Sequence, residues 1–338
     1  MVAKLRPELM ETQKTTAPVS ALMPAYNAAA FVREAIESVF AQTLPPAEFI
    51  VVDDGSTDDT ARIAESMGVR VIRQANAGLP GARNRCVREA SQPWVAFIDD
   101  DDAWMPEKLE RQMQIASQHP EVGLVSCDFT IFDKGGTIVG SGLEKYGRDY
   151  ELQPKRRCQG AVIIDQLDER FASAHYFLLP TYVMIRRDLL LAVGMFDETL
   201  ESAEDFDCFM RIISGAPFAI ADQNLVRRRE HASNASSRLV NNTLQCLAVT
   251  YKVIEHPELY PPATVALCKR WLPSNLRHAA ARQLSIGNRT EARKLLRESV
   301  KLELSPRTLL ALSASITPAV IGKNLMSARY FVSKRFGI

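Results

Sequence analysis

The chain of 338 residues has few cysteines, and their spacing excludes two common ways of stabilising a fold. Its six cysteines lie far apart and form no C-x-x-C pair. Structural zinc sites and disulfide frameworks need closely spaced or patterned cysteines, so neither is expected. Unpaired cysteines are typical of a reducing compartment, and the sequence therefore predicts a cytoplasmic protein.

Long apolar runs and an excess of either charge are also missing. No stretch reaches the roughly 18 apolar residues that a membrane-spanning helix needs. Residues 1–17 carry several charges and have no apolar core of the kind found in signal peptides, so we expect a flexible leader. With 41 Lys+Arg against 40 Asp+Glu, the formal net charge is +1. With so small a net charge the protein has no overall positive electrostatic field that would attract polyanions, and we expect no nucleic-acid partner.

What the sequence does have is an alternation of strand and helix patterns. Short β-branched or apolar runs predict strands at 19–23, 49–52, 69–72 and 94–98. Between them lie residues with helical spacing, the first such segment being 31–40. Alternation at this spacing is typical of βαβ units. The sequence therefore predicts an α/β fold with a mostly parallel sheet flanked by helices.

Polar segments follow three of the predicted strands, namely Pro24–Asn27, Asp53–Asp58 and Asp99–Asp102. Because the carboxyl ends of parallel strands meet at one rim of a sheet, we expect these segments to lie together. The third segment places four carboxylates directly after a buried strand. Two unit charges about 4 Å apart repel by roughly 4 kcal/mol at an effective dielectric of about 20, so this run needs solvation or a cation.

The acidic run suggests a partial metal site. In an extended chain alternate side chains point the same way, which would place Asp99 and Asp101 on one side. Carboxylate oxygens suit Mg²⁺ or Mn²⁺, and these ions complete their shells with water and substrate phosphates. Short motifs have many false matches, so a solvated acidic turn is the alternative.

Six blocks of the sequence, in order, resemble one enzyme family. The first four are VSALMPAYNAAAFVREAIESVFAQT, EFIVVDDGSTDDT, NAGLPGARNRCVREA and WVAFIDDDDAWMPEKL, and the later two are VMIRRDLLLAVGMFDE and AEDFDCFMRI. Residues 18–109 resemble the nucleotide-binding half of the inverting family-2 glycosyltransferases, which have the GT-A fold. The later blocks resemble the acceptor-side half of that family, and the resemblance extends to about residue 235.

The resemblance implies a set of residues that bind a nucleotide sugar. It places the nucleotide base against Pro24, Ala25 and Tyr26, with Asp54 accepting a hydrogen bond from the base. It places Arg83 near the diphosphate, where a guanidinium matches phosphate oxygens.

The resemblance also implies a metal site and a catalytic base. Asp99 matches the family's acidic residue near the donor ribose or the metal ion. Asp101 matches the carboxylate that holds the divalent ion, and His231 is implied as a further metal ligand. The family commonly has a small polar residue where this chain has Asp100, which we group with the sugar-nucleotide residues. Asp205 matches the catalytic base, and the alternative is that it only stabilises a helix N-terminus.

The patterns divide the chain into three parts. After the leader, residues 18–235 form the predicted GT-A domain, with a nucleotide-binding half at 18–110 and an acceptor-side half at 111–235. Residues 236–338 show helical spacing and no match to the family, so we expect a separate helical C-terminal module.

These observations predict an inverting, metal-assisted hexosyl or N-acetylhexosaminyl transferase of cell-surface polysaccharide biosynthesis. Its donor would be a nucleotide-diphosphate sugar, UDP before GDP or dTDP, and its acceptor a hydroxyl of a glycan or lipid-linked molecule. A catalytically silent nucleotide-sugar-binding module is one alternative. A metal-dependent phosphohydrolase is another, although it would need an aspartate nucleophile after the first strand, where Pro24–Asn27 stands.

The tail predicts reversible binding to the inner face of a cell membrane, with plain packing on the catalytic domain as the alternative. After Glu303 no acid follows, whereas five Lys or Arg residues do. Each basic residue near an anionic surface contributes about 1 kcal/mol, an attraction that salt screens. We expect the protein to co-sediment with anionic vesicles at low salt and deletion of residues 305–338 to abolish this. No binding, or binding that salt leaves unchanged, would favour intramolecular packing.

Overall fold

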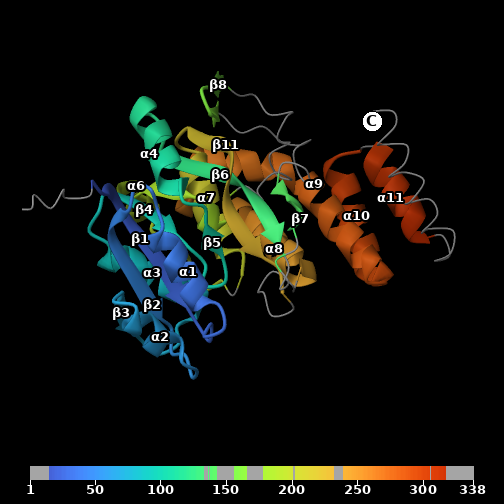
Figure 1. Cartoon of the computed structure of the whole chain (residues 1–338). Coiled ribbons are helices and arrows are strands. Elements are labelled where there is room, and N and C mark those ends of the chain that lie inside the picture. Colours follow the sequence, from blue (N-terminus) through green and yellow to red (C-terminus); the bar gives the residue numbers. More distant parts are fainter. Residues whose placement is uncertain are drawn as a thin grey trace, which may run out of the picture.

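Figure 1 shows the computed structural model of the chain. The structure describes residues 15–132, 136, 138–142, 156–165, 178–200, 202–231, 239–304 and 306–316. In this part of the chain a sheet of eleven strands forms the centre, with the order β3-β2-β1-β4-β10-β6-β11-β9-β8 along its main path. The predicted α/β architecture is confirmed. Most of the expected leader, residues 1–14, lies outside the described part.

The first half of the sheet is the parallel βαβ part that the sequence pattern predicted. Its elements are β1 (Ala17–Ala25), α1 (Val32–Phe40), β2 (Pro46–Asp53), α2 (Thr60–Ser66), β3 (Arg70–Arg73), α3 (Gly78–Glu89) and β4 (Trp94–Phe97). β1 pairs in parallel with both β2 and β4, and β2 pairs in parallel with β3. Every residue of β1 except Pro18 is buried, as expected for a central parallel strand that is covered on both faces.

The second half of the sheet is mixed. Its elements are β5 (Ala103–Trp104), α4 (Lys108–Gln118), β6 (Leu124–Phe132), β7 (Ile138–Ser141), β8 (Arg156–Cys158), β9 (Ala161–Ile164), η3 (Pro180–Tyr182), β10 (Met184–Arg186), α6 (Arg187–Ala192), α7 (Glu204–Ile213) and β11 (Phe218–Arg229). β10 runs antiparallel to both β4 and β6 and so joins the two halves. β11 lies parallel to β6 and antiparallel to β9.

A two-residue strand connects the acidic run to the second half of the sheet. In β5, Ala103 pairs with Arg227 and Trp104 pairs with Val226 of β11. Because β5 follows directly after Asp99–Asp102, this pairing brings the acidic run beside the end of β11. His231 lies two residues beyond that end.

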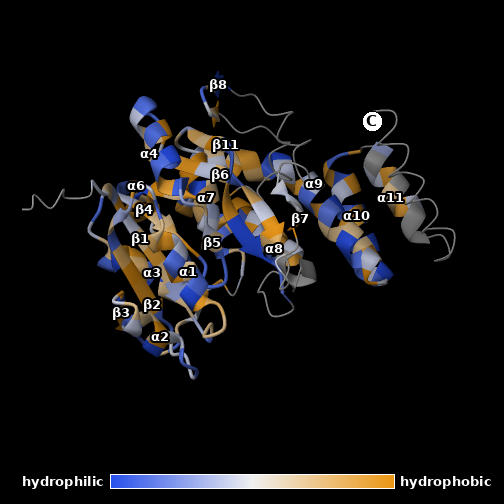
Figure 2. Ribbon diagram, in the orientation of Figure 1, coloured by the Kyte–Doolittle hydropathy of each residue, from blue (hydrophilic) through white to orange (hydrophobic). Residues whose placement is uncertain are grey.

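The C-terminal helices are α8 (Leu239–Glu255), α9 (Pro262–Ser285), α10 (Arg289–Leu302) and α11 (Pro306–Ile316), with a short 3-10 turn, η5 (Pro257–Leu259), after α8. α8 and the first half of α9 belong to the main core, to which they contribute Val249, Val253 and the fully buried Trp271. A second core forms where α9, α10 and α11 pack together around Leu276 and Leu296. In Figure 2 the central strands are largely orange, whereas α9 and α10 carry both orange and blue residues.

No helix among the described residues is long and apolar enough to cross a membrane. Of the tail for which we predict vesicle binding, the structure describes α11, and residues 317–338 lie outside the described part.

Lys108 on α4 is a charged side chain inside the core. It is 0% exposed, its Nζ donates to Gln112 Oε1 at 2.9 Å, and the same atom lies 4.1 Å from the centre of the Trp104 ring. Burial lowers the pKa of Lys108 to about 8, because desolvation disfavours the ammonium form.

We predict that Lys108→Met is most stabilising, relative to the wild type, below pH 8. Between pH 8 and 10.5 the unfolded chain still binds the lysine proton that the folded chain has released, so the wild-type unfolding free energy rises. The difference between the two proteins should therefore shrink by about 3 kcal/mol over this range. Urea unfolding of both proteins from neutral to alkaline pH measures it. A constant difference would mean that Lys108 titrates at its ordinary pKa.

Candidate active site

The carboxyl ends of β1, β2 and β4 meet at one rim of the sheet, as predicted. The backbone N–H of Tyr26 donates to Asp100 Oδ2 at 3.0 Å, although 74 residues separate the two. The backbone N–H of Asp54 donates to the carbonyl of Ala25 at 2.9 Å. The three polar segments therefore form one continuous surface.

Asp54, expected to bind the nucleotide base, is buried and fixed by the segment that follows β3. Its Oδ1 accepts from Gln74 Nε2 at 2.7 Å and from the N–H of Ala77 at 2.9 Å. The neighbouring Gly55 has a φ of 77°, and a Cβ at this position would lie 2.9 Å from the backbone nitrogen of Asn76. Only glycine fits such a turn without strain.

The other residues expected at the base differ in exposure. Pro24 and Ala25 are buried within β1, whereas Tyr26 is 51% exposed at the end of the strand. Of the three, Tyr26 has the accessible side chain, and an exposed aromatic ring can stack on a planar base.

Asp99–Asp102 forms a tight turn and not the extended segment that we expected. The N–H of Asp102 donates to the carbonyl of Asp99 at 3.1 Å, so the side chains do not alternate between two sides. Each acid has a different partner: Asp99 contacts Arg83, Asp100 the Tyr26 N–H, Asp101 His231 and Asp102 the Arg229 N–H. The expected strand geometry was wrong, because pairing of β5 with β11 requires the chain to turn first.

Burial and mutual repulsion make the acidic turn electrostatically unfavourable. Burial, with the charge of Asp101 beside it, raises the pKa of Asp100 to about 8. Burial and the charge of Asp99 raise the pKa of Asp101, although its contact with His231 opposes this. A cation among these carboxylates would relieve the repulsion.

The two expected metal ligands, Asp101 and His231, lie side by side. His231 Nε2 is 2.9 Å from Asp101 Oδ2, and the imidazole stacks on Phe31 with 4.7 Å between ring centroids. A carboxylate oxygen and an imidazole nitrogen can both bind a divalent ion, so these residues fit one. Among the described residues no cluster of three acidic, histidine or cysteine side chains is preformed. The remaining ligands would therefore be water and donor phosphates.

Arg83 lies beneath the rim and connects two parts of the site. It is 3% exposed, its Nη1 forms an ion pair with Glu204, and its Nη2 lies 3.3 Å from Asp99 Oδ1. The guanidinium thereby joins the end of β4 to the start of α7. Its expected proximity to a diphosphate stays a prediction, since both contacts described here are with protein carboxylates.

Asp205 stands in the first turn of α7, next to Glu204. The residue before the helix, Ala203, has a φ of 63°, and its carbonyl accepts from the N–H of Asp207 at 3.0 Å, which closes that turn. Burial raises the pKa of Glu204 to about 7, because desolvation and the charge of Asp205 outweigh the attraction of Arg83. The first turn of α7 therefore presents two carboxyl groups with different environments.

Two contributors to the site gave no sequence signal. The Phe31 ring stacks against the imidazole of His231, and Glu34 forms an ion pair with Arg229, which is 195 residues further along the chain. Both lie at the start of α1, where helical spacing indicates only packing. No local pattern could have revealed contacts that depend on where β11 ends.

The parallel half of the sheet and the acidic turn at its rim lie within the region that a family model matches, and the carboxylate pair at the start of α7 follows that region. The family model described as glycosyl transferase family 2 matches residues 20–190, about half of the chain. The chain belongs to glycosyltransferase family 2.

Curated relatives share this region at moderate identity. An uncharacterized glycosyltransferase of Rickettsia prowazekii (strain Madrid E) is 28% identical over 227 residues, which are 66% of this chain and 67% of that protein. Chondroitin synthase of Escherichia coli is 27% identical over 230 residues, which are 67% of this chain and 31% of that protein. The chain thus spans between about a third and two thirds of the length of these relatives.

Solved structures show the same fold. The crystal structure of S. aureus TarS 1-349 in complex with UDP-GlcNAc aligns with a TM-score of 0.63 at 20% identity, covering 87% of this chain and 83% of that one. A mannosyltransferase of Pyrobaculum calidifontis in complex with GDP-Man and Mn²⁺ aligns with a TM-score of 0.52 at 18% identity, covering 94% of this chain and 85% of that one. These likenesses confirm the GT-A fold.

We predict that Asp101→Ala weakens Mn²⁺-dependent binding of UDP or GDP without unfolding the protein. Loss of a ligand should cost at least the roughly 10- to 100-fold that changes in the outer shell of a metal site cost. Calorimetry with each nucleotide, with and without Mn²⁺, measures the effect. Asp188→Ala is the control, because Asp188 lies on α6 and is 62% exposed. Nucleotide affinity that Asp101→Ala leaves unchanged would remove Asp101 from the metal site.

Proposed function

We propose that this protein transfers a sugar, with inversion, from a nucleotide-diphosphate sugar to a hydroxyl of a glycan or lipid-linked acceptor. The observation that carries the proposal is the position of Arg83, which contacts both Asp99 and Glu204. One guanidinium thus bridges the acidic turn, where the donor diphosphate would bind, and the helix that bears Asp205, and it fixes the distance between them. The reacting groups of a direct displacement need such close and fixed placement.

UDP is the nucleotide that we propose first. Support comes from TarS, the fold neighbour whose structure contains UDP-GlcNAc. In this chain the exposed Tyr26 ring offers a stacking surface, and the Asp54 carboxylate offers an acceptor. The proposed donor sugar is therefore a hexose or an N-acetylhexosamine. GDP is the second choice, because the Pyrobaculum neighbour contains GDP-Man.

A divalent cation held by Asp101 and His231 is part of this proposal. When bound, the ion would neutralise charge on the departing nucleoside diphosphate. The chain itself supplies a rim where burial and charge repulsion already favour a cation. An imidazole ligand favours Mn²⁺ over Mg²⁺, which prefers oxygen ligands. A Mn²⁺ ion also accompanies GDP-Man in the Pyrobaculum neighbour.

Asp205 is the proposed general base. Its carboxylate takes the proton from the acceptor hydroxyl as that oxygen attacks the anomeric carbon, while the bond from this carbon to the donor phosphate breaks. A single displacement of this kind inverts the anomeric carbon. Asp207, the next acid along α7, is 1% exposed and is bound by Arg211 and Tyr260, so it cannot reach an acceptor.

The proposed setting is cell-surface polysaccharide biosynthesis at the inner face of the membrane. Support comes from the basic tail and from the relative that is a chondroitin synthase. The silent binding module and the phosphohydrolase remain distinguishable alternatives. The first would bind donor without transfer, and the second would release phosphate from the donor without an acceptor.

We predict that Asp205→Asn lowers sugar transfer by roughly 10² to 10⁴ while donor affinity stays near the wild-type value. Asn keeps the shape of the side chain and removes its ability to take a proton. A panel of UDP-, GDP- and dTDP-sugars is first screened to find the donor. Release of the corresponding nucleoside diphosphate with acceptor present then measures the transfer rate, and calorimetry measures donor affinity.

Asp59→Asn is the matched control, since Asp59 is an exposed aspartate at the start of another helix, α2. It should cost at most about 1 kcal/mol of stability and no activity. Transfer by Asp205→Asn at the wild-type rate would move the role of base to another residue, with Glu204 the first candidate.

A further inference from the structure

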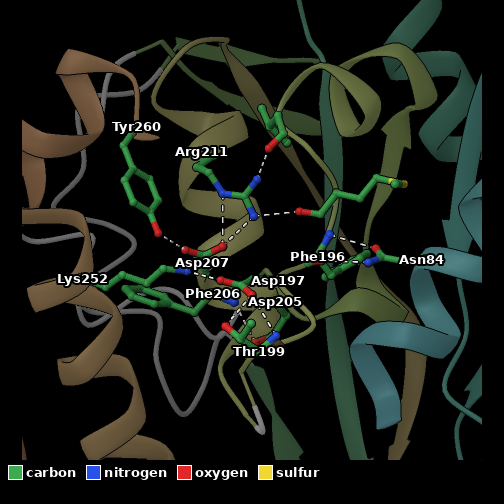
Figure 3. Close-up of polar contacts among 12 residues, drawn as sticks. Asn84, Phe196, Asp197, Thr199, Asp205, Phe206, Asp207, Arg211, Lys252 and Tyr260 are labelled. Atoms are coloured by element: carbon green, nitrogen blue, oxygen red, sulfur yellow. Dashed lines mark hydrogen bonds and ion pairs between the residues drawn. The ribbon is translucent and has the colours of Figure 1, made fainter. Parts of the chain in front are cut away.

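Two contacts from the C-terminal helices hold α7 near its two ends. Tyr260, which follows η5, donates its hydroxyl proton to Asp207 Oδ1 at 2.9 Å near the start of α7. At the other end of α7, the hydroxyl of Thr264 on α9 contacts that of Ser214. Figure 3 shows Tyr260 pointing from the C-terminal helices toward Asp207. The helix that carries the proposed base is therefore contacted near both ends by residues of the C-terminal part.

Asp207 is the centre of a buried polar cluster. Its second oxygen, Oδ2, accepts from Arg211 Nη2 at 2.6 Å, and Arg211 also donates to the carbonyls of Val193 and, at 2.7 Å, Met195. Met195 has a φ of 61°, an unfavourable value for a side chain with a Cβ, and the arginine contact helps to hold it there. Tyr260 and Arg211 thus satisfy the two oxygens of one desolvated carboxylate.

The same helices hold the segment that precedes α7. Lys252 of α8 forms an ion pair with Asp197. One residue earlier, the N–H of Phe196 donates to Asn84 Oδ1 at 2.9 Å, and Asn84 Nδ2 donates back to the Phe196 carbonyl at 2.8 Å. Figure 3 shows Lys252 and Tyr260 to the left of Asp207 and the Phe196–Asn84 pair to its right. α8 and α3 thus both hold the segment that precedes α7.

Two observations connect this cluster to Asp205. Asp207 lies two residues further on, and its N–H closes the helical turn that contains Asp205. α8, which carries Lys252, also contacts α7 itself. Movement of Asp207 would therefore move Asp205 relative to an acceptor.

We propose that Tyr260 is a positioning residue, whose hydroxyl fixes the first turn of α7 through Asp207 and so sets the place of Asp205. This inference rests on the proposed function, in which Asp205 is the base. Arg211 already neutralises the charge of Asp207. The Tyr260 hydroxyl therefore fixes the orientation of the Asp207 carboxylate. Without it, Asp207 Oδ1 would be a buried acceptor with no described donor, which the helix can relieve only by shifting or by admitting water.

The test compares Tyr260→Phe with the wild type. Phe keeps the ring and its packing and removes only the hydroxyl. We expect kcat for transfer to fall by about 10- to 100-fold, because a displacement of about 1 Å at reacting groups can cost this much. Donor affinity should change much less than kcat, since Tyr26, Asp54 and Asp101 lie just beyond the ends of β1, β2 and β4, whereas Tyr260 acts on the first turn of α7.

Tyr251→Phe is the matched control. Tyr251 of α8 donates to Glu298 of α10 in the same kind of tyrosine–carboxylate bond, but within the helical module and away from α7. This variant should keep the wild-type kcat. Equal losses of kcat in the two variants would show a general effect of module stability and would overturn the proposal.

A double-mutant cycle separates action through Asp205 from other effects. If Tyr260 only places the base, Tyr260→Phe should have little further effect on the residual rate of Asp205→Asn. The same loss in both backgrounds, a parallel loss of donor affinity, or a wild-type kcat in Tyr260→Phe would each overturn the proposal.

Hydrogen exchange gives a readout that needs no activity. Amides of the first turn of α7 should exchange faster in Tyr260→Phe than in Tyr251→Phe or the wild type. If the wild type transfers no sugar from any donor of the panel, the proposed function fails while this measurement still decides whether Tyr260 fixes α7. Unchanged exchange in α7 would show that it does not.

Discussion

The buried guanidinium of Arg83 is the contact on which the site depends most. It pairs with Asp99 at the end of β4 and with Glu204 at the start of α7, and it is itself 3% exposed. Removing one partner from a buried ion pair typically costs 3–5 kcal/mol, because the other charge is left desolvated. The three elements that meet there can therefore not move independently. A fixed distance between the acidic turn, where we propose that the donor binds, and Asp205, the proposed base, follows from this one constraint.

The acidic turn shows how the fold maintains a charge distribution that would otherwise be unstable. Each of its four carboxylates has a separate partner, and the partners come from β1, α3 and the end of β11. The pKa values of Asp100 and Asp101 are still raised, first by burial and then by the charges of the neighbouring aspartates, so these contacts do not remove the repulsion. The remaining negative potential at the rim is what a divalent cation would neutralise. Formation of the site and the proposed cation affinity thus have a common electrostatic origin.

The C-terminal helices belong to the architecture of the site. α8 and the first half of α9 share the main core with the sheet, down to the fully buried Trp271. Beyond that residue α9, α10 and α11 form a second core, to which α8 adds Leu247. The helices thus cover apolar surface of the catalytic part and also supply Tyr260 and Lys252 to the segment around Asp205. One packing interface serves both stability and the placement of the proposed base.

The sequence by itself determined the parallel half of the sheet and the rim where its strands end, because strand and helix periodicities are local and βαβ units leave few alternatives. Its resemblance to the family also predicts Asp101 and His231 as metal ligands and Asp205 as the base. The tertiary structure alone decided that Asp99–Asp102 turns, that Arg83 joins Glu204 across 121 residues, and that Tyr260 meets Asp207 across 53. Such contacts depend on strand register and on how whole elements pack, and residue spacing along the chain carries no record of either.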